Sequence, residues 1–113
     1  MKKDVEVFLR HIFESIGLIE SYTSNITKLD FFKSQQAQDA VIRRLEIIGE
    51  AAKSVPPEYR KKYQQIPWKE IAGMRDILVH EYFGVDLDLT WRTVQEDIPA
   101  LKQNLSSILG AEK

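Results

Sequence analysis

Two side chains in one short stretch, Arg75 and His80, are of types that could cleave RNA without a metal ion, and Tyr82 follows two residues later. An arginine can hold a phosphate through two hydrogen bonds and stabilise charge that develops on it. A histidine can accept the proton of a ribose 2′-hydroxyl near neutral pH. A histidine near a helix end is more often structural than catalytic, so the spacing alone leaves both interpretations open.

The spacing also limits how these side chains can meet. Arg75 and Tyr82 are seven residues apart, which on a regular α-helix places them within about 20° of the same face, whereas His80 points about 140° away from Arg75. Convergence therefore requires either that the helix unwinds near His80, close to Gly84, or that a second chain brings another copy alongside. A symmetric dimer would supply both copies to one cleft.

A second set of polar residues shares one helix face. Asp39, Arg43, Glu46 and Glu50 follow one another at intervals of four, three and four residues, so they form a stripe. Such a stripe is usually a salt-bridged solvent face. The alternative is that it supports a dimer interface or borders an active cleft. A metal site is disfavoured because no histidine is paired with the carboxylates, and His11 is interpreted as structural.

The charge of the chain restricts how it could contact nucleic acid. A formal net charge of −1 gives no overall basic field, so any contact with RNA must be local. Cationic residues cluster at Arg43-Arg44 and at 60–62, with Lys69 and Arg75 further along the chain. Clusters of this kind are usually solvated helix faces.

Helical periodicity predicts the elements that position these residues. Apolar residues recur at three- and four-residue steps from about Asp4 to Tyr22, which predicts a first long helix. Thr27 and Asp30 have the spacing of a capping box, which can start a helix, and a short turn that carries Phe31 and Phe32 should follow.

A second long helix is predicted from Gln36 up to the proline pair at 56–57, because proline stops a helix. The residues from Glu58 to Tyr63 should form one helical turn. Pro67 then stands in the first turn of a further helix that begins around Trp68.

The last part of the chain has a further apolar pattern. Apolar positions continue from the Trp68 helix to Leu78 and Val79, and Gly84 offers a helix end. Asp86 or Asp88 can cap a final helical segment, which Pro99 should kink or divide.

The composition fits one small globular domain. The chain has 113 residues, of which 43% are hydrophobic and 29% charged, and no alternating strand pattern is present. We therefore expect an all-α fold, a single domain over residues 1–113 that packs four or five helices as a bundle. Without cysteine, disulfides and thiolate metal sites are excluded. The sequence contains no signal-peptide pattern and no membrane span, which favours the cytoplasm.

Three stretches of the sequence together resemble one family. They are QDAVIRRLEIIGEAAK at 38–53, IPWKEIAGMR at 66–75 and LVHEYFGVD at 78–86. In this order they are similar to the HepT-type HEPN proteins, and the likeness runs from the first helix almost to the C-terminus. An ordered series of stretches is far more specific than an arginine and a histidine alone.

The resemblance implies an all-helical HEPN homodimer that cleaves host RNA without metal or cofactor, as the toxin of a toxin–antitoxin pair. It implies that Arg75 and His80 are the catalytic pair. It also implies that Tyr82 accepts AMP groups from a minimal nucleotidyltransferase antitoxin, which neutralises the toxin. Many members of the family have asparagine where this chain has Asp76, and a carboxylate there could pair with Arg75 or repel RNA.

Two alternative functions remain open from the sequence. The chain could be a non-catalytic helical module that docks a nucleotidyltransferase, as its near-neutral charge and Asp76 would allow. Alternatively, Arg75 could be a buried salt-bridge partner and His80 a core residue, with a structural role only.

Overall fold

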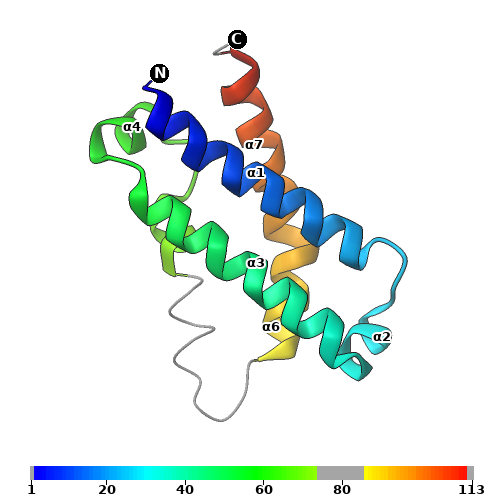
Figure 1. Cartoon of the computed structure of the whole chain (residues 1–113). Helices are drawn as coiled ribbons and strands as arrows, with labels where there is room; N and C mark the ends of the chain where they lie inside the picture. The colour runs from blue at the N-terminus through cyan, green and yellow to red at the C-terminus, as the bar shows by residue number, and fades with distance from the viewer. Residues whose placement is uncertain (1, 74–85, 112–113) are drawn as a thin grey trace.

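A computed structural model describes residues 2–73 and 86–111, and all regular structure in these ranges is helical (Figure 1). The helices are α1 (Lys3–Thr23), α2 (Lys28–Lys33), α3 (Gln35–Ser54), α4 (Pro57–Lys62), α6 (Leu87–Arg92) and α7 (Ile98–Ala111), with a π-helical segment η1 (Thr93–Asp97) before α7. Residues 68–73 are helical as well. The predicted all-α class is confirmed for the described part of the chain. The helix start predicted at Thr27 is confirmed by α2, which also includes Phe31 and Phe32, where a short turn was expected. The helical turn expected from Glu58 to Tyr63 is the six-residue helix α4.

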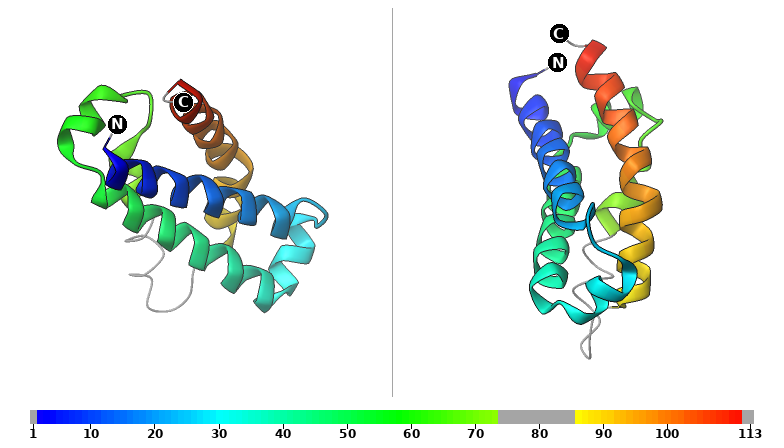
Figure 2. Two further views of the ribbon diagram at one scale, coloured as in Figure 1. Left: turned by 45° about the horizontal axis from the view of Figure 1, so that its top comes forward. Right: turned by 90° about the vertical axis from the view of Figure 1, so that its right-hand side faces the viewer.

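The long helices pack in two layers. Helices α1 and α3 run antiparallel side by side, and the continuous α6–η1–α7 rod packs against them (Figures 1 and 2). Helix α2 closes one end of the α1–α3 pair. Helix α4 lies at the other end, where the Lys2 backbone N–H donates to the Tyr59 hydroxyl at 3.2 Å.

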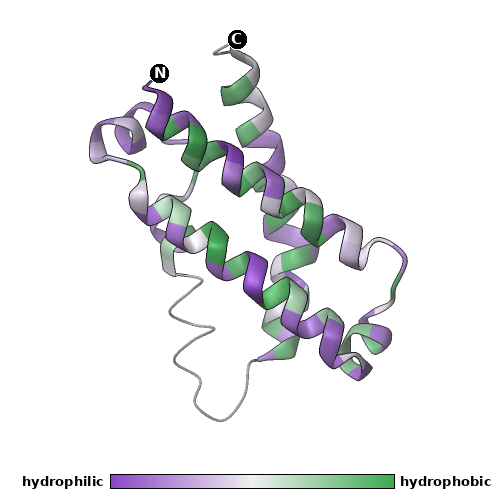
Figure 3. Cartoon of the chain, in the orientation of Figure 1, coloured by the Kyte–Doolittle hydropathy of each residue, from purple (hydrophilic) through white to green (hydrophobic). Residues whose placement is uncertain are grey.

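The core is built from the apolar faces that the periodicity predicted. Hydrophobic and hydrophilic residues alternate along α1 and α3 as expected of amphipathic helices (Figure 3). The fully buried side chains include Leu9, Ile12, Ile16, Leu45 and Ile48. Burial of each such side chain contributes roughly 1.5–3 kcal/mol, so contact between α1 and α3 is a main source of stability.

The predicted capping box at the start of α2 is confirmed. The Asp30 backbone N–H donates to the Thr27 hydroxyl at 3.1 Å, and the Thr27 backbone N–H donates to the Asp30 carboxylate at 3.0 Å. The amide of Gln38 donates to the carbonyl oxygens of Phe31 and Phe32 at 3.0 and 3.1 Å. These bonds satisfy backbone groups at both ends of a short helix, which explains why it persists for six residues.

The last rod changes its helix type just before Pro99 and is not divided there. Proline has no N–H to donate to the Gln95 carbonyl, and the chain adopts the π segment η1 just before it. The Ile98 backbone N–H therefore reaches back to the Thr93 carbonyl. The rod continues through Pro99 into α7 (Figure 1).

None of the helices in the described part of the chain has the length and apolarity that a membrane crossing requires.

Candidate functional site

The predicted catalytic and modified residues lie outside the described residues. Arg75, Asp76, His80 and Tyr82 all belong to residues 74–85. The same holds for the apolar positions and the helix end predicted between 78 and 84. The structure does describe both flanks of this segment, which we call the motif segment.

The N-terminal flank is anchored to the core through Trp68. Its indole N–H donates to the Tyr63 carbonyl at 3.0 Å, and only 8% of the Trp68 side chain is exposed. Ile66 and Ile71 on either side of it are buried. Pro67 immediately precedes the helical residues 68–73, so the predicted helix start is confirmed. The chain therefore enters the motif segment from a fixed helical turn.

The C-terminal flank is anchored by a helix cap. The Asp86 carboxylate accepts the Leu89 backbone N–H at 3.0 Å, and the Thr90 hydroxyl donates to the Asp86 carbonyl at 2.9 Å. Of the two predicted capping residues, Asp86 is therefore the one that caps α6. Asp88 instead pairs with Lys28 of α2 at 2.6 Å.

A mainly apolar cleft of about 600 Å³ lies between residues 65–71 and the α6–η1–α7 rod. Ile71, Leu89 and Leu101 contribute to its wall, and the charged lining residues are the carboxylates Glu70 and Asp97. Among the described residues, this lining contains no arginine, lysine or histidine. A phosphate would meet negative charge there, so the cleft is unsuited to an anionic ligand.

The polar stripe on α3 is divided between two environments. Arg43, Glu46 and Glu50 line a hollow of about 490 Å³ between α1 and α3. The Arg43 guanidinium lies 3.7 Å from the Glu46 carboxylate, and these side chains are 70% and 30% exposed. Asp39 instead accepts a hydrogen bond from the amide of Gln35 at 2.8 Å. The salt-bridged solvent face is thus observed at Arg43 and Glu46.

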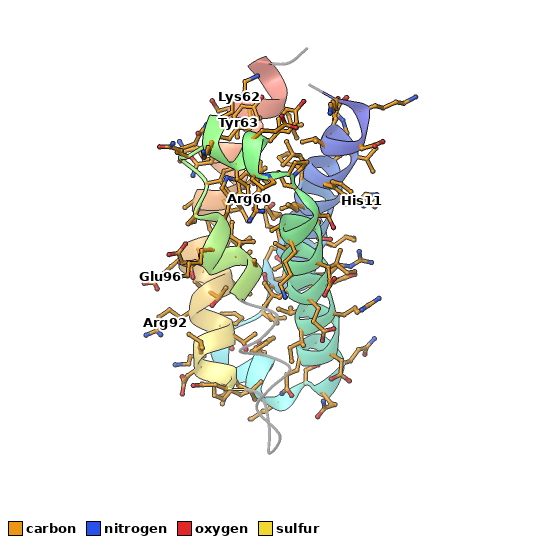
Figure 4. The ribbon with its side chains drawn as sticks, turned by 90° about the vertical axis from the view of Figure 1, so that its left-hand side faces the viewer. His11, Arg60, Lys62, Tyr63, Arg92 and Glu96 are labelled. Atoms are coloured by element: carbon orange, nitrogen blue, oxygen red, sulfur yellow. The ribbon has the colours of Figure 1, made fainter. Side chains whose placement is uncertain are left out.

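One polar residue of this hollow was missed from the sequence. His11 of α1 is exposed and lines the hollow with the α3 stripe, and its side chain projects from the outer side of α1 (Figure 4). The sequence interpretation gave it no polar neighbours. Only the packing of α1 on α3 brings it beside residues 43–50, and no local spacing signals this. No group of residues suited to a metal ion occurs in the described ranges.

The chain is similar over most of its length to known proteins. The family described as HepT-like (Ribonuclease HepT-like) matches residues 12–108. A protein of Methanocaldococcus jannaschii named "Gamma-glutamylcyclotransferase and putative RNase" is 61% identical over 109 residues, which cover 96% of this chain and 49% of that protein. The chain therefore spans about half the length of that relative. The "Probable ribonuclease HepT" of Thermococcus cleftensis is 50% identical over 102 residues, 90% of this chain and 93% of the relative.

A solved structure supports the fold. It is that of a tri-AMPylated HEPN toxin from Shewanella oneidensis in complex with MNT antitoxin, and it matches with a TM-score of 0.70. The match covers 97% of this chain and 99% of the other at 21% identity, so the likeness concerns the fold. With the all-helical HEPN fold and the family match over residues 12–108, the chain belongs to the HepT-like ribonuclease family.

Proposed function

We propose that this protein is a single-domain ribonuclease that acts as the toxin of a toxin–antitoxin pair in the cytoplasm. The observation that carries the proposal is the family match over residues 12–108, a range that contains Arg75, His80 and Tyr82. The 50% identical relative whose name is that of a ribonuclease supports the same activity.

The proposed reaction needs no metal ion. His80 accepts the proton of a ribose 2′-hydroxyl, whose oxygen attacks the adjacent phosphorus while the bond from phosphorus to the 5′-oxygen breaks. Arg75 holds the non-bridging phosphate oxygens and stabilises their developing charge. The leaving 5′-oxygen takes a proton from the partner subunit's His80. The products are a 2′,3′-cyclic phosphate and a 5′-hydroxyl.

The proposal includes a homodimer because the motif side chains do not converge on one regular helix. The hollow between α1 and α3 is proposed to support that interface or the site through Arg43, Glu46 and Glu50. Its lining presents both positive and negative side chains, which a second copy could pair with. Asp76, next to Arg75 in sequence, is expected to moderate activity by pairing with the guanidinium or repelling RNA.

A minimal nucleotidyltransferase is the proposed antitoxin. The structural neighbour is an AMPylated HEPN toxin bound to an MNT antitoxin, which supports a partner of this kind. The Tyr82 oxygen would attack the α-phosphorus of ATP, releasing pyrophosphate and leaving AMP on the tyrosine. Each AMP adds negative charge and bulk beside His80, where an RNA phosphate must bind.

The experiment is to induce the chain in growing cells without its antitoxin. We expect growth arrest with the wild type and normal growth with His80→Ala. The control is Gln103→Ala, which removes an exposed side chain on α7 and should leave toxicity unchanged. A His80→Ala protein that remains fully toxic would contradict the proposal.

The second candidate function is a non-catalytic module that docks the nucleotidyltransferase. The formal charge of −1 and Asp76 favour it, because neither helps to bind RNA. In that case purified protein would bind the transferase and leave RNA intact at any concentration. Detection of cyclic phosphate ends on cleaved RNA would reject the docking module.

A further inference from the structure

A basic surface lies at the end of the molecule where α4 meets residues 68–73. It is a hollow of about 770 Å³. Its lining residues are Lys53, Pro57, Arg60, Lys61, Gln64, Trp68, Lys69, Ala72 and Gly73. We define the basic surface by its four cations, Lys53, Arg60, Lys61 and Lys69. They come from α3, α4 and the helical turn before the motif segment.

The charge of this surface departs from that of the rest of the protein. Among the described residues, its lining contains four cations and no carboxylate, although the whole chain has a formal charge of −1. By contrast, the α1–α3 hollow contains Glu46 and Glu50, and the apolar cleft contains Glu70 and Asp97. Cations gathered without acidic neighbours make a local positive potential that attracts anions.

Three of the four cations are not engaged by acidic groups. Arg60, Lys61 and Lys69 form no ion pair with any residue in the described ranges. Lys61 and Lys69 are exposed, and Arg60 is half-buried with an Nε that has no hydrogen-bond partner in the described structure. In Figure 4, Arg60 lies in the same half of the molecule as Lys62 and Tyr63, and Arg92 lies in the other half. The exposed Lys61 and Lys69 are therefore available to an anionic ligand, whereas the Arg60 Nε is buried.

The basic surface is held in place through Trp68 and lies next to the motif segment in the sequence. Trp68 is held by its hydrogen bond to the Tyr63 carbonyl, so the cations stand on a rigid base. Gly73, at the edge of the lining, is the last described residue before the motif segment. Arg75 follows Gly73 by two residues, a reach of at most about 7 Å of extended chain. The surface therefore borders the start of the motif segment.

We propose that the basic surface binds the phosphate backbone of RNA next to the bond that is cleaved. The identity of the ligand rests on the proposed function. Lysines and arginines that contact phosphates position a nucleic acid without reading its sequence. A local patch of this kind also explains how a protein without overall positive charge could hold RNA. The charge complementarity favours RNA, and an acidic protein partner is the alternative that the experiment must exclude.

The test compares two double variants in a His80→Ala background, which keeps the RNA intact. Lys61→Gln with Lys69→Gln removes two exposed charges from the basic surface, and Lys33→Gln with Arg92→Gln removes two exposed charges from α2 and α6. Binding of a fluorescent single-stranded RNA of mixed sequence is measured by anisotropy over a series of salt concentrations. Melting temperatures verify that all variants are folded.

We expect the surface variant to bind RNA more weakly and to lose about 1.4 from the slope of log affinity against log salt, since each phosphate contact contributes about 0.7 on single strands. The control variant should bind like its parent. Equal losses in the two variants would overturn the proposal. So would unchanged RNA binding together with lost binding of the nucleotidyltransferase, which would identify an acidic protein as the occupant.

Cleavage is measured separately with the His80-containing protein, so that the two proposals can fail independently. If the protein binds RNA through the basic surface but never cleaves it, the proposed ribonuclease activity is rejected and the proposed RNA-binding role of the surface stands. The Lys61→Gln with Lys69→Gln variant is also assayed at RNA concentrations below KM. If it cleaves RNA as fast as the wild type, the ribonuclease proposal stands and RNA binding by the basic surface is rejected.

Discussion

Arg75, His80 and Tyr82 have proposed roles that side-chain replacement can separate. Arg75 and His80 act on the RNA phosphate and the ribose proton, so removing either should abolish the reaction. In the proposal, Tyr82 has no part in cleavage and serves only as the acceptor of AMP. Its hydroxyl should therefore matter to neutralisation and not to toxicity.

The Tyr82→Phe variant tests this division of roles. We expect it to cleave RNA at a rate within about threefold of the wild type, because phenylalanine keeps the ring and removes only the hydroxyl. It should gain no AMP when incubated with the nucleotidyltransferase and ATP, as followed by intact-protein mass spectrometry. Wild-type protein is the positive control. A Tyr82→Phe variant that still gains AMP would place the acceptor elsewhere.

Candidate site residues could be chosen from the sequence only where the informative residues lie close together in the chain. Arg75, His80 and Tyr82 share one short stretch, so their spacing and the family resemblance select them as candidates, and their roles stay predictions. His11 meets the α3 stripe only through helix packing. Lys53 and Lys69 are 16 residues apart and meet at one surface for the same reason.

Element ends were predictable where a local signal sets them. The Thr27 and Asp30 pair, Asp86 and the proline pair at 56–57 each act within a few residues, and the observed helix ends agree with them. The π segment before Pro99 was not predictable. The lost hydrogen bond could have produced a kink, a break or a change of helix type, and packing of the whole rod decides among these.

The capping box at α2 should make stability depend on pH. The pKa of Asp30 is lowered from its ordinary value of 3.8, chiefly because the Thr27 backbone N–H donates to the carboxylate and secondly because of the Thr27 side chain. A lowered pKa in the folded state means that the stabilisation is present above pH 3.8 and is lost as the pH falls through the lower folded value.

Asp30→Asn tests this dependence at the level of one helix. The variant should be less stable than wild type at neutral pH, and the difference should shrink as the pH falls below 3.8. Denaturant unfolding at a series of pH values measures it. Asp39→Asn is a control because it replaces an exposed carboxylate outside the capping box. If the difference in stability between Asp30→Asn and wild type stays constant with pH, the proposed contribution of the Asp30 carboxylate to stability is contradicted.

At the scale of the whole molecule, Phe31 connects α2 to the α6–η1–α7 rod. It is fully buried, and its ring centroid lies 5.3 Å from that of Trp91. This contact was not specified by local sequence, although the periodicity did predict the all-α class and most of the buried faces. The way in which two copies would associate is not encoded in any local pattern, and the homodimer rests on the convergence argument and the family.

Phe31→Ala should therefore weaken the entire fold. We expect the free energy of unfolding to fall by about 3–5 kcal/mol, the usual cost of removing a buried phenylalanine ring. Urea unfolding followed by circular dichroism measures the change. Leu29→Ala is the matched control, since Leu29 of the same helix is 62% exposed and should cost less than about 1 kcal/mol. Equal decreases in the free energy of unfolding for the two variants would contradict the proposed role of Phe31.

The central claim, metal-independent RNA cleavage by the Arg75 and His80 pair, is tested most directly with purified protein and single-stranded RNA in the presence of EDTA. The chemical ends of the products and the cleavage rate are measured for wild type, His80→Ala and the control Gln103→Ala, which changes an exposed residue of α7. We predict 2′,3′-cyclic phosphate ends from wild type and Gln103→Ala at similar rates, and no cleavage by His80→Ala with an unchanged melting temperature. Cleavage by His80→Ala at the wild-type rate would contradict the account.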